Sequence, residues 1–216
     1  MKSFVNDTDI FDGRLDEFAS VLKGILPEKL DSVLVAGLGN KNITADSLGP
    51  KVNGYILATR HLSDSDESGL GELFSVACVS TGVLGDTGIE TAEIIKGVAN
   101  QIKPSCIIVV DALAATSMDR LGNTVQFSDT GISPGSGVGN HRFEISEKTL
   151  GVPVISIGIP TVVSTAVISD TLSSGAYVTP REIDRICEQG AKLIGMGINV
   201  CFQKGLSSEE LYALVG

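Results

Sequence analysis

Two aspartates, Asp46 and Asp111, each stand close behind an apolar run that is typical of a buried strand. Asp46 lies in the loop GLGNKNITADSLGP at residues 37–50, after the run at 32–36, and Asp111 directly follows the run at 106–110. In open α/β sheets the ligand crevice lies outside the carboxyl ends of the strands. If the two strands are parallel and adjacent, we expect both carboxylates to project into one crevice.

Two carboxylates in an apolar crevice do not both ionise easily, because like charges raise the pKa of one of them. The pair can then share one proton, so that one member acts as a general base toward water and the other as a general acid, as in an aspartic hydrolase. The same pair could instead hold a divalent cation, with His141 as a third ligand. Two simpler roles also stay open: Asp46 or Thr44 could cap the next helix, and Asp111 could be a turn residue that accepts backbone amides.

The loop at 37–50 does not match a phosphate-binding loop. Only the first two glycines of the dinucleotide pattern G-x-G-x-x-G are present, because Asn42 stands at the third position, and no G-K-[ST] follows. We therefore interpret the loop as a turn that delivers Asp46 to the crevice, and we predict that Asn40 contributes to substrate binding.

A second glycine-rich loop, DTGISPGSGVGNHR at 129–142, is long for a connector, and such loops more often bind ligands. Asp129 opens this loop and could either hold its backbone or contact the site. His141, near its end, is a further candidate for substrate binding. The backbone amides that could converge on a substrate carbonyl or its oxyanion are those of Gly135, Ser136, Gly137 and Gly139.

The apolar pattern predicts the elements that position these loops. Continuous apolar runs, typical of strands covered on both faces, occur at 33–36, 73–79, 107–110 and 154–159. Apolar residues at helical spacing predict helices over 15–25 and 89–99. The alternation of helices and strands predicts an α/β fold, a single three-layer α/β/α domain over residues 1–216 with a mainly parallel sheet.

Two tetrads resemble helix N-termini. Thr179-Pro180-Arg181-Glu182 combines an N-cap threonine, a proline at the first helical position and a capping glutamate, and predicts a helix from that point. Thr87-Gly88-Ile89-Glu90 reads as a capping box, which gives Glu90 a structural role.

Composition excludes several classes of partner. The formal net charge of −10, without a basic stripe, disfavours direct binding to nucleic acid or to an anionic membrane and favours a protein or peptide substrate. No signal peptide or apolar span of membrane length is present in the sequence. The four cysteines lack metal-binding spacing and are expected to be reduced, which indicates a cytosolic protein.

The motifs together resemble those of the germination protease family, the spore endopeptidases that degrade small acid-soluble spore proteins. The resemblance covers roughly residues 31 to 200. It rests, in order, on GLGNKNITADSLGP at 37–50, TRHL at 59–62, GVLGDTGIET at 82–91, VVDALAA at 109–115, SDTGISPGSGVGNHR at 128–142 and LGVPVISIGIPTVV at 150–163.

The resemblance implies an atypical aspartic endopeptidase in the cytoplasm of the spore core, in which Asp46 and Asp111 match the two essential aspartates. It also implies a fold similar to hydrogenase maturation proteases, whose nickel-binding acids occupy corresponding positions, so a divalent metal at this pair stays open and no other cofactor is expected. This chain resembles a shortened member, because only about thirty residues precede the first predicted strand, and activation by propeptide cleavage is not expected.

Three functions therefore remain after the sequence is read. The first is an aspartic endopeptidase acting on spore proteins, the second a metal-assisted peptidase of the maturation type, and the third a non-catalytic relative that binds spore proteins. The sequence is also compatible with a homo-oligomer.

Overall fold

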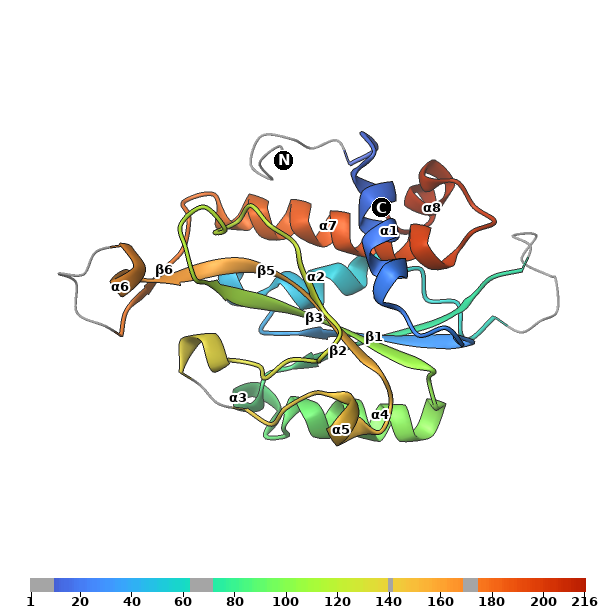
Figure 1. Ribbon diagram of the computed structural model, residues 1–216, viewed down its shortest axis with the longest axis horizontal. Helices are drawn as coiled ribbons and strands as arrows, with labels where there is room; N and C mark the ends of the chain where they lie inside the picture. Colours follow the sequence, from blue (N-terminus) through green and yellow to red (C-terminus); the bar gives the residue numbers. More distant parts are fainter. Residues whose placement is uncertain (1–9, 63–71, 140–141, 169–174) are drawn as a thin grey trace.

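The computed structural model describes residues 10–62, 72–139, 142–168 and 175–216. Within these ranges all strands belong to one sheet in the order β2-β1-β3-β5-β4, with β6 pairing β5 (Figure 1). The long strands β1, β2, β3 and β5 are parallel to their neighbours among these four, as the sequence predicted, whereas β4 and β6 run antiparallel to β5. The strands are β1 (Ser32–Leu38), β2 (Ser75–Gly82), β3 (Cys106–Ala115), β4 (Gln126–Ser128), β5 (Val154–Ser164) and β6 (Tyr177–Val178).

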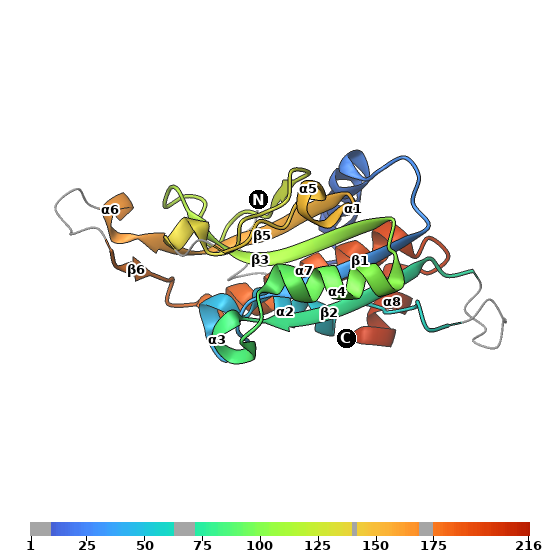
Figure 2. The same cartoon turned by 90° about the horizontal axis from the view of Figure 1, so that it is seen from below.

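Helices cover both faces of this sheet, so the predicted three-layer architecture is confirmed (Figures 1 and 2). One layer contains α1 (Arg14–Ile25), α2 (Leu48–Gly54), α7 (Ile183–Phe202) and α8 (Ser208–Val215). The opposite layer contains α4 (Thr91–Ile102) and α5 (Glu147–Leu150). Shorter elements complete the described chain: the helices α3 (Leu84–Thr87) and α6 (Thr165–Ile168), and the 3-10 turns η1 (Thr44–Asp46) and η2 (Ser136–Val138).

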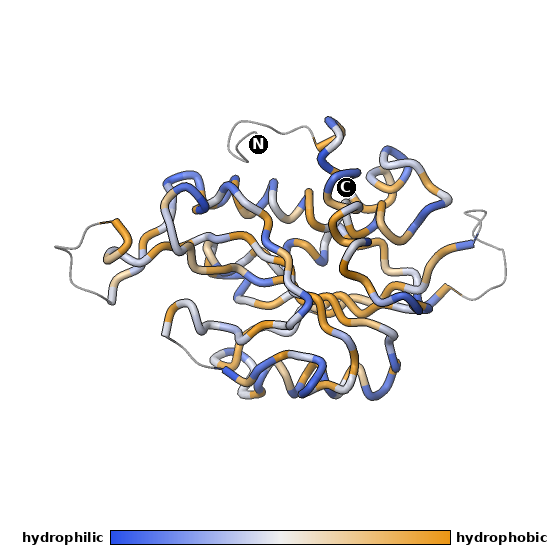
Figure 3. The backbone as a smooth tube through the Cα atoms, viewed as in Figure 1, coloured by the Kyte–Doolittle hydropathy of each residue, from blue (hydrophilic) through white to orange (hydrophobic). Residues whose placement is uncertain are grey.

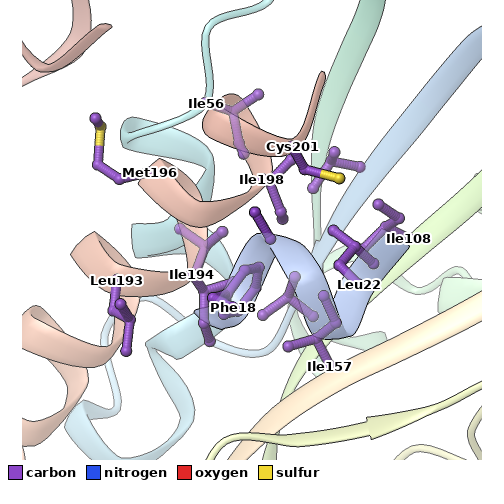
Figure 4. Close-up of a cluster of buried hydrophobic side chains, with 14 of the residues drawn as sticks. Phe18, Leu22, Ile56, Ile108, Ile157, Leu193, Ile194, Met196, Ile198 and Cys201 are labelled. Atoms are coloured by element: carbon purple, nitrogen blue, oxygen red, sulfur yellow. The ribbon is translucent and has the colours of Figure 1, made fainter. Parts of the chain in front are cut away.

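The apolar strands separate two hydrophobic cores, one on each face of the sheet. Because side chains alternate along a strand, Ile108 joins the core beneath α1 and α7, and Ile107 joins the core beneath α4. Figure 4 shows Ile108 close to Leu22 of α1, in the same cluster as Phe18. Hydrophobic residues are concentrated along the central strands in Figure 3, which agrees with burial of both faces.

The predicted start of the C-terminal helix is wrong. Helix α7 begins at Ile183 with Glu182 as its N-cap residue, so Thr179 and Pro180 precede the helix instead of opening it. The residues that pack into the core begin at Ile183, and the exposed segment 181–182 gains no packing from being helical. Tertiary packing therefore decided the boundary over local capping preference.

Helix α4 also starts differently from the prediction. Its N-cap is Glu90 itself, whose N–H donates to the Glu93 carboxylate at 3.2 Å. The Thr87 hydroxyl instead donates to the carbonyl of Val83 within the turn around α3. Glu90 therefore has a capping role, but at a different position from the one predicted.

Strand β3 is longer than its neighbour β1, and this difference positions the site. The pairing of β1 with β3 ends at Gly37 and Val110, whereas the pairing of β3 with β5 continues to Ala115 and Val163. Figure 1 shows β3 and β5 running on together toward α6. The last residues of β3 thus project beyond the end of β1, at the carboxyl edge of the parallel strands.

No helix in the described ranges combines the length and the apolar character that a membrane crossing needs.

Candidate active site

A cavity of about 490 Å³ lies at the carboxyl edge of the sheet. Its walls come from the end of β1 and the following loop, the end of β2, the middle of β3 and the second glycine-rich loop. Both Asp46 and Asp111 line it, so the two segments predicted to meet in one crevice do meet there. We call this cavity the crevice.

Asp111 is a strand residue that is only 6 % exposed. One oxygen of its carboxyl group accepts the N–H of Ala112 at 2.9 Å. Burial is the main reason that the pKa of Asp111 rises from 3.8 to about 7, the negative charge of Asp46 raises it further, and the Ala112 hydrogen bond lowers it. Because β3 continues to Ala115, the alternative that Asp111 is a turn residue is wrong.

Asp46 is the last residue of η1 and is half-buried. Its carboxylate accepts the backbone N–H of Asn40 at 2.8 Å. Burial raises the pKa of Asp46, and the hydrogen bond from Asn40 partly opposes this rise. The carboxylate does not cap α2, whose N-cap residue is Ser47, so the capping alternative is wrong.

Close packing explains the glycines of the first loop. Gly39 has a φ of +107°, and a Cβ there would lie 2.1 Å from the carbonyl oxygen of Asp46. A Cβ on Gly37 would lie 2.3 Å from the carbonyl oxygen of Gly49 at the start of α2. The glycines therefore let the loop fold back tightly on the helix, and this brings the Asp46 carboxylate to the end of β1.

The two aspartates form an electrostatically coupled pair. The charge of Asp46 contributes to the raised pKa of Asp111, which requires the two carboxyl groups to interact across the crevice. Asp111 is the more buried of the two, so it is the member that keeps a proton near neutral pH. Such a pair can supply a base and an acid to one reacting group.

The second glycine-rich loop reaches the crevice with only part of its predicted residues. Gly135 lines the crevice, and Ser136 and Gly137 line an adjoining cavity of about 230 Å³ that also contacts Asp111. Gly139 lines neither of these two cavities. His141 lies outside the described residues.

Asn40 lines the crevice, but its backbone is the part that contacts the aspartate pair. Its N–H binds Asp46, and its side-chain oxygen accepts the N–H of Asn42 at 2.9 Å. The structure therefore gives Asn40 a role in positioning Asp46, and its predicted contact with substrate stays a prediction.

Asp129 does not reach the crevice. It is exposed and lines a separate depression together with Glu144 and Lys148. The reason is strand direction: β4 runs antiparallel to β5, so the residue that follows β4 emerges at the edge opposite to the carboxyl ends of the parallel strands. The predicted contact of Asp129 with the aspartate pair is not supported.

Sequence reasoning missed two charged side chains of the crevice, Glu90 and Arg142. Both line the cavity, with Arg142 Nη1 3.9 Å from Glu90 Oε1. Glu90 was assigned to capping alone, and Arg142 was overlooked beside His141. Both residues lie in quoted motifs, Glu90 in GVLGDTGIET at 82–91 and Arg142 in SDTGISPGSGVGNHR at 128–142, and this was the signal that could have found them.

The described residues do not form a metal site by themselves. No group of three or more His, Cys, Asp or Glu side chains suited to a metal ion occurs among them. Asp46 and Asp111 each also use one oxygen for a backbone N–H, and a protein site for a divalent ion usually offers three or more ligands. We therefore derive no step through a metal.

Comparison with known proteins agrees with the motifs. The family model "Germination protease" matches residues 6–176. The germination protease of Geobacillus sp. (strain WCH70) is 51% identical over 90% of this chain and 53% of its own length, and that of Clostridium acetobutylicum is 43% identical over 90% of this chain and 73% of its own length.

A solved structure shares the fold at low sequence identity. The [NiFe] hydrogenase maturation protease HycI from Thermococcus kodakarensis superimposes with a TM-score of 0.50 at 19% identity, covering 83% of this chain and 99% of its own. The fold similarity predicted from the sequence is thus confirmed. The family match over most of the chain, with relatives at 40 to 50% identity, shows that this protein belongs to the germination protease family of peptidases.

Proposed function

We propose that this protein is an endopeptidase that degrades small acid-soluble spore proteins during germination, using Asp46 and Asp111 to activate a water molecule. The observation that carries the proposal is the buried, coupled pair: burial and the charge of Asp46 raise the pKa of Asp111 to about 7. A carboxylic acid and a carboxylate therefore face the same crevice below neutral pH.

The chemistry follows from this distribution of charge. The Asp46 carboxylate takes a proton from water as the water oxygen attacks the scissile carbonyl carbon, and the proton of Asp111 passes to the carbonyl oxygen. The tetrahedral intermediate collapses as the proton on Asp46 moves to the leaving nitrogen, and the hydroxyl proton returns to Asp111. The Ala112 N–H and the Asn40 N–H keep the two carboxyl groups oriented throughout.

The charge of the chain supports a protein substrate over a nucleic acid complex. With a net charge of −10, the protein is repelled by DNA phosphates, so it would act on spore proteins once they have left DNA. The site of action in this proposal is the cytoplasm of the spore core.

The direct test is cleavage of a purified small acid-soluble spore protein, followed by mass spectrometry to map the cut sites. Asp46→Asn and Asp111→Asn should each lower kcat/KM by roughly 10³-fold, within the range known for loss of an acid or base. Asp129→Asn is the matched control, because Asp129 is an exposed carboxylate outside the crevice. Unchanged cleavage by either crevice variant would remove the aspartic mechanism.

Two further measurements separate the alternatives. Loss of activity with EDTA, restored by one divalent metal, would favour the metal-assisted peptidase. Binding of the spore protein without turnover, unaffected by either substitution, would favour the non-catalytic relative.

A further inference from the structure

The crevice-side edge of β3 has no partner strand over residues 111–115. Within the described chain, β1 pairs with β3 only as far as Val110, while β5 covers the other edge to Ala115. An unpaired strand edge presents a row of peptide N–H and C=O groups that can pair with another chain. We call residues 111–115 the free edge.

One close approach shows which peptide groups face outward from this edge. The carbonyl of Asp111 faces β5, since a Cβ on Gly158 would lie 2.6 Å from its oxygen. Successive peptide groups of a strand point to opposite sides, and the register shift after Leu113 places its extra residue, Thr161, on β5 and not on β3. The peptide groups of Ala112 and Ala114 therefore face away from β5. The Ala112 N–H is already bound to the Asp111 carboxyl group, which leaves the Ala112 carbonyl and both polar groups of the Ala114 backbone.

The space beside the free edge lies where a continuation of β1 would run. The crevice is lined by Leu38 and Gly39 at the end of β1, by Gly82 at the end of β2, and by Ala112 on β3. Because β1 lies between β2 and β3, the crevice occupies the position into which β1 would continue.

The turn at Gly39 is the reason that β1 stops. Its φ of +107° directs the chain away from the sheet and toward Asp46, so the loop that supplies one carboxylate also vacates the strand position. The adjoining cavity reaches Ala114 across the face of the sheet, since it is also lined by Val162 of β5 and Gln126 of β4. The free edge therefore opens on the crevice at Asp111 and Ala112 and on the adjoining cavity at Ala114.

We propose that the protein substrate binds in this gap as an added β-strand, with its backbone paired to Ala112 and Ala114 and its scissile peptide group beside Asp111. The proposal rests on the peptidase function above and specifies how that function recognises its substrate. The free edge spans about 16 Å, room for roughly five extended residues. Main-chain pairing supplies affinity for any unfolded segment, and the pockets for alternate side chains supply sequence preference.

The test is a backbone scan of an eight-residue peptide spanning a cut site mapped in the spore protein. Each residue in turn is N-methylated, which removes its N–H and leaves its side chain intact. Strand pairing predicts that the effect of methylation alternates with a period of two residues. At positions whose N–H faces β3, kcat/KM should fall by about tenfold or more, because at least one hydrogen bond is lost. At the intervening positions kcat/KM should fall by less than about threefold. Equal sensitivity at all positions, or none, would overturn the added strand.

A proline on the free edge tests the hydrogen bonds that β3 is proposed to make with the substrate. Ala114→Pro removes an outward N–H without breaking the β5 pairing, so KM should rise about tenfold while kcat changes little. Ser208→Pro is the control, because it places a proline at the first position of α8, where proline is well tolerated. An unchanged KM in a folded Ala114→Pro protein would contradict the pairing.

A peptide-binding assay distinguishes a failure of the added strand from a failure of the proposed catalytic mechanism. Fluorescence anisotropy with the labelled peptide should show that Asp111→Asn still binds without cleaving, whereas Ala114→Pro binds about tenfold more weakly. If the aspartate variants lose turnover but the scan shows no alternation, strand addition fails and the aspartic mechanism stands. If the alternation appears in binding while the aspartate variants cleave normally, the mechanism fails and the added strand stands.

Discussion

The two halves of β3 have the same backbone conformation and opposite surroundings. Residues 106–110 lie between β1 and β5 and are completely buried, whereas residues 111–115 have a strand on one side only and are partly exposed at 112–114. The first half is held by packing on both faces, and this holds the second half rigidly at the edge of the crevice. One strand thus supplies both the rigid support and the proposed catalytic group, and the change of surroundings occurs at a single residue, Asp111.

The largest expected difference between the halves is produced by Asp111→Asn. Activity should fall by about 10³-fold, while the free energy of unfolding at pH 8 should rise by at least about 1 kcal/mol, because the variant no longer buries a charge there. Urea unfolding and peptidase assays on the same preparation measure the two effects. A variant that is both inactive and less stable at pH 8 would show that Asp111, like residues 106–110, is needed for the folded structure.

The pH dependence of stability follows from the same residue. The folded pKa of Asp111 is about 7 against 3.8 unfolded, so its contribution to stability is fully present below about pH 4 and is lost as pH rises to about 7. The expected loss is up to about 4 kcal/mol, to be measured by urea unfolding at pH 4.5 and 8.

Two variants test the origin of this slope. Asp111→Asn should abolish most of it, and Asp46→Asn should reduce it only partly, because burial is the larger cause and the charge of Asp46 the smaller. The other charged groups of the crevice, Glu90 and Arg142, stay in place in both variants. An unchanged slope in Asp111→Asn would assign the pH dependence to another group.

Truncation of an apolar side chain should lower the free energy of unfolding by different amounts in the two halves of β3. Ile108→Ala, in the completely buried half, should cost about 3 kcal/mol, whereas Leu113→Ala, on the free edge, should cost about 1 kcal/mol. Thermal and urea unfolding of the two variants compare them directly. Equal costs would mean that the free edge is packed as tightly as the core.

The last prediction concerns the glycines that position Asp46. Gly39→Ala should cost about 2 kcal/mol and lower activity, because a Cβ there meets the Asp46 carbonyl at a positive φ. Gly97→Ala in α4 is the matched control: no atom lies within 4 Å of its added Cβ, and the helix should gain about 0.5 to 1 kcal/mol. A neutral Gly39→Ala would refute the tight turn at the end of β1.

The sequence predicted the core of the fold because four strands are buried on both faces, which makes them continuous apolar runs. It underestimated β3 and β5, since Asp111 and Pro160 interrupt their apolar runs. The short strands β4 and β6 were missed because their existence depends on pairing with β5 and not on local composition.

The sequence also predicted that Asp46 and Asp111 meet, because Asp46 follows β1 and Asp111 lies where β3 passes the end of β1, at the shared carboxyl edge of parallel strands. It failed for Asp129, because the direction of β4 could not be known from its residues. The charged neighbours Glu90 and Arg142 depend on how two loops fold back, which spacing along the chain does not encode.

The reversed direction of β4 has a practical consequence for experiments on this protein. The exposed residues Asp129 and Thr130 emerge on the rim away from the crevice. A fluorophore on Thr130→Cys would therefore report on the molecule without obstructing substrate entry, and three of the four native thiols are buried and would compete little for the dye. This turn offers a handle for surface immobilisation or single-molecule work on the working enzyme.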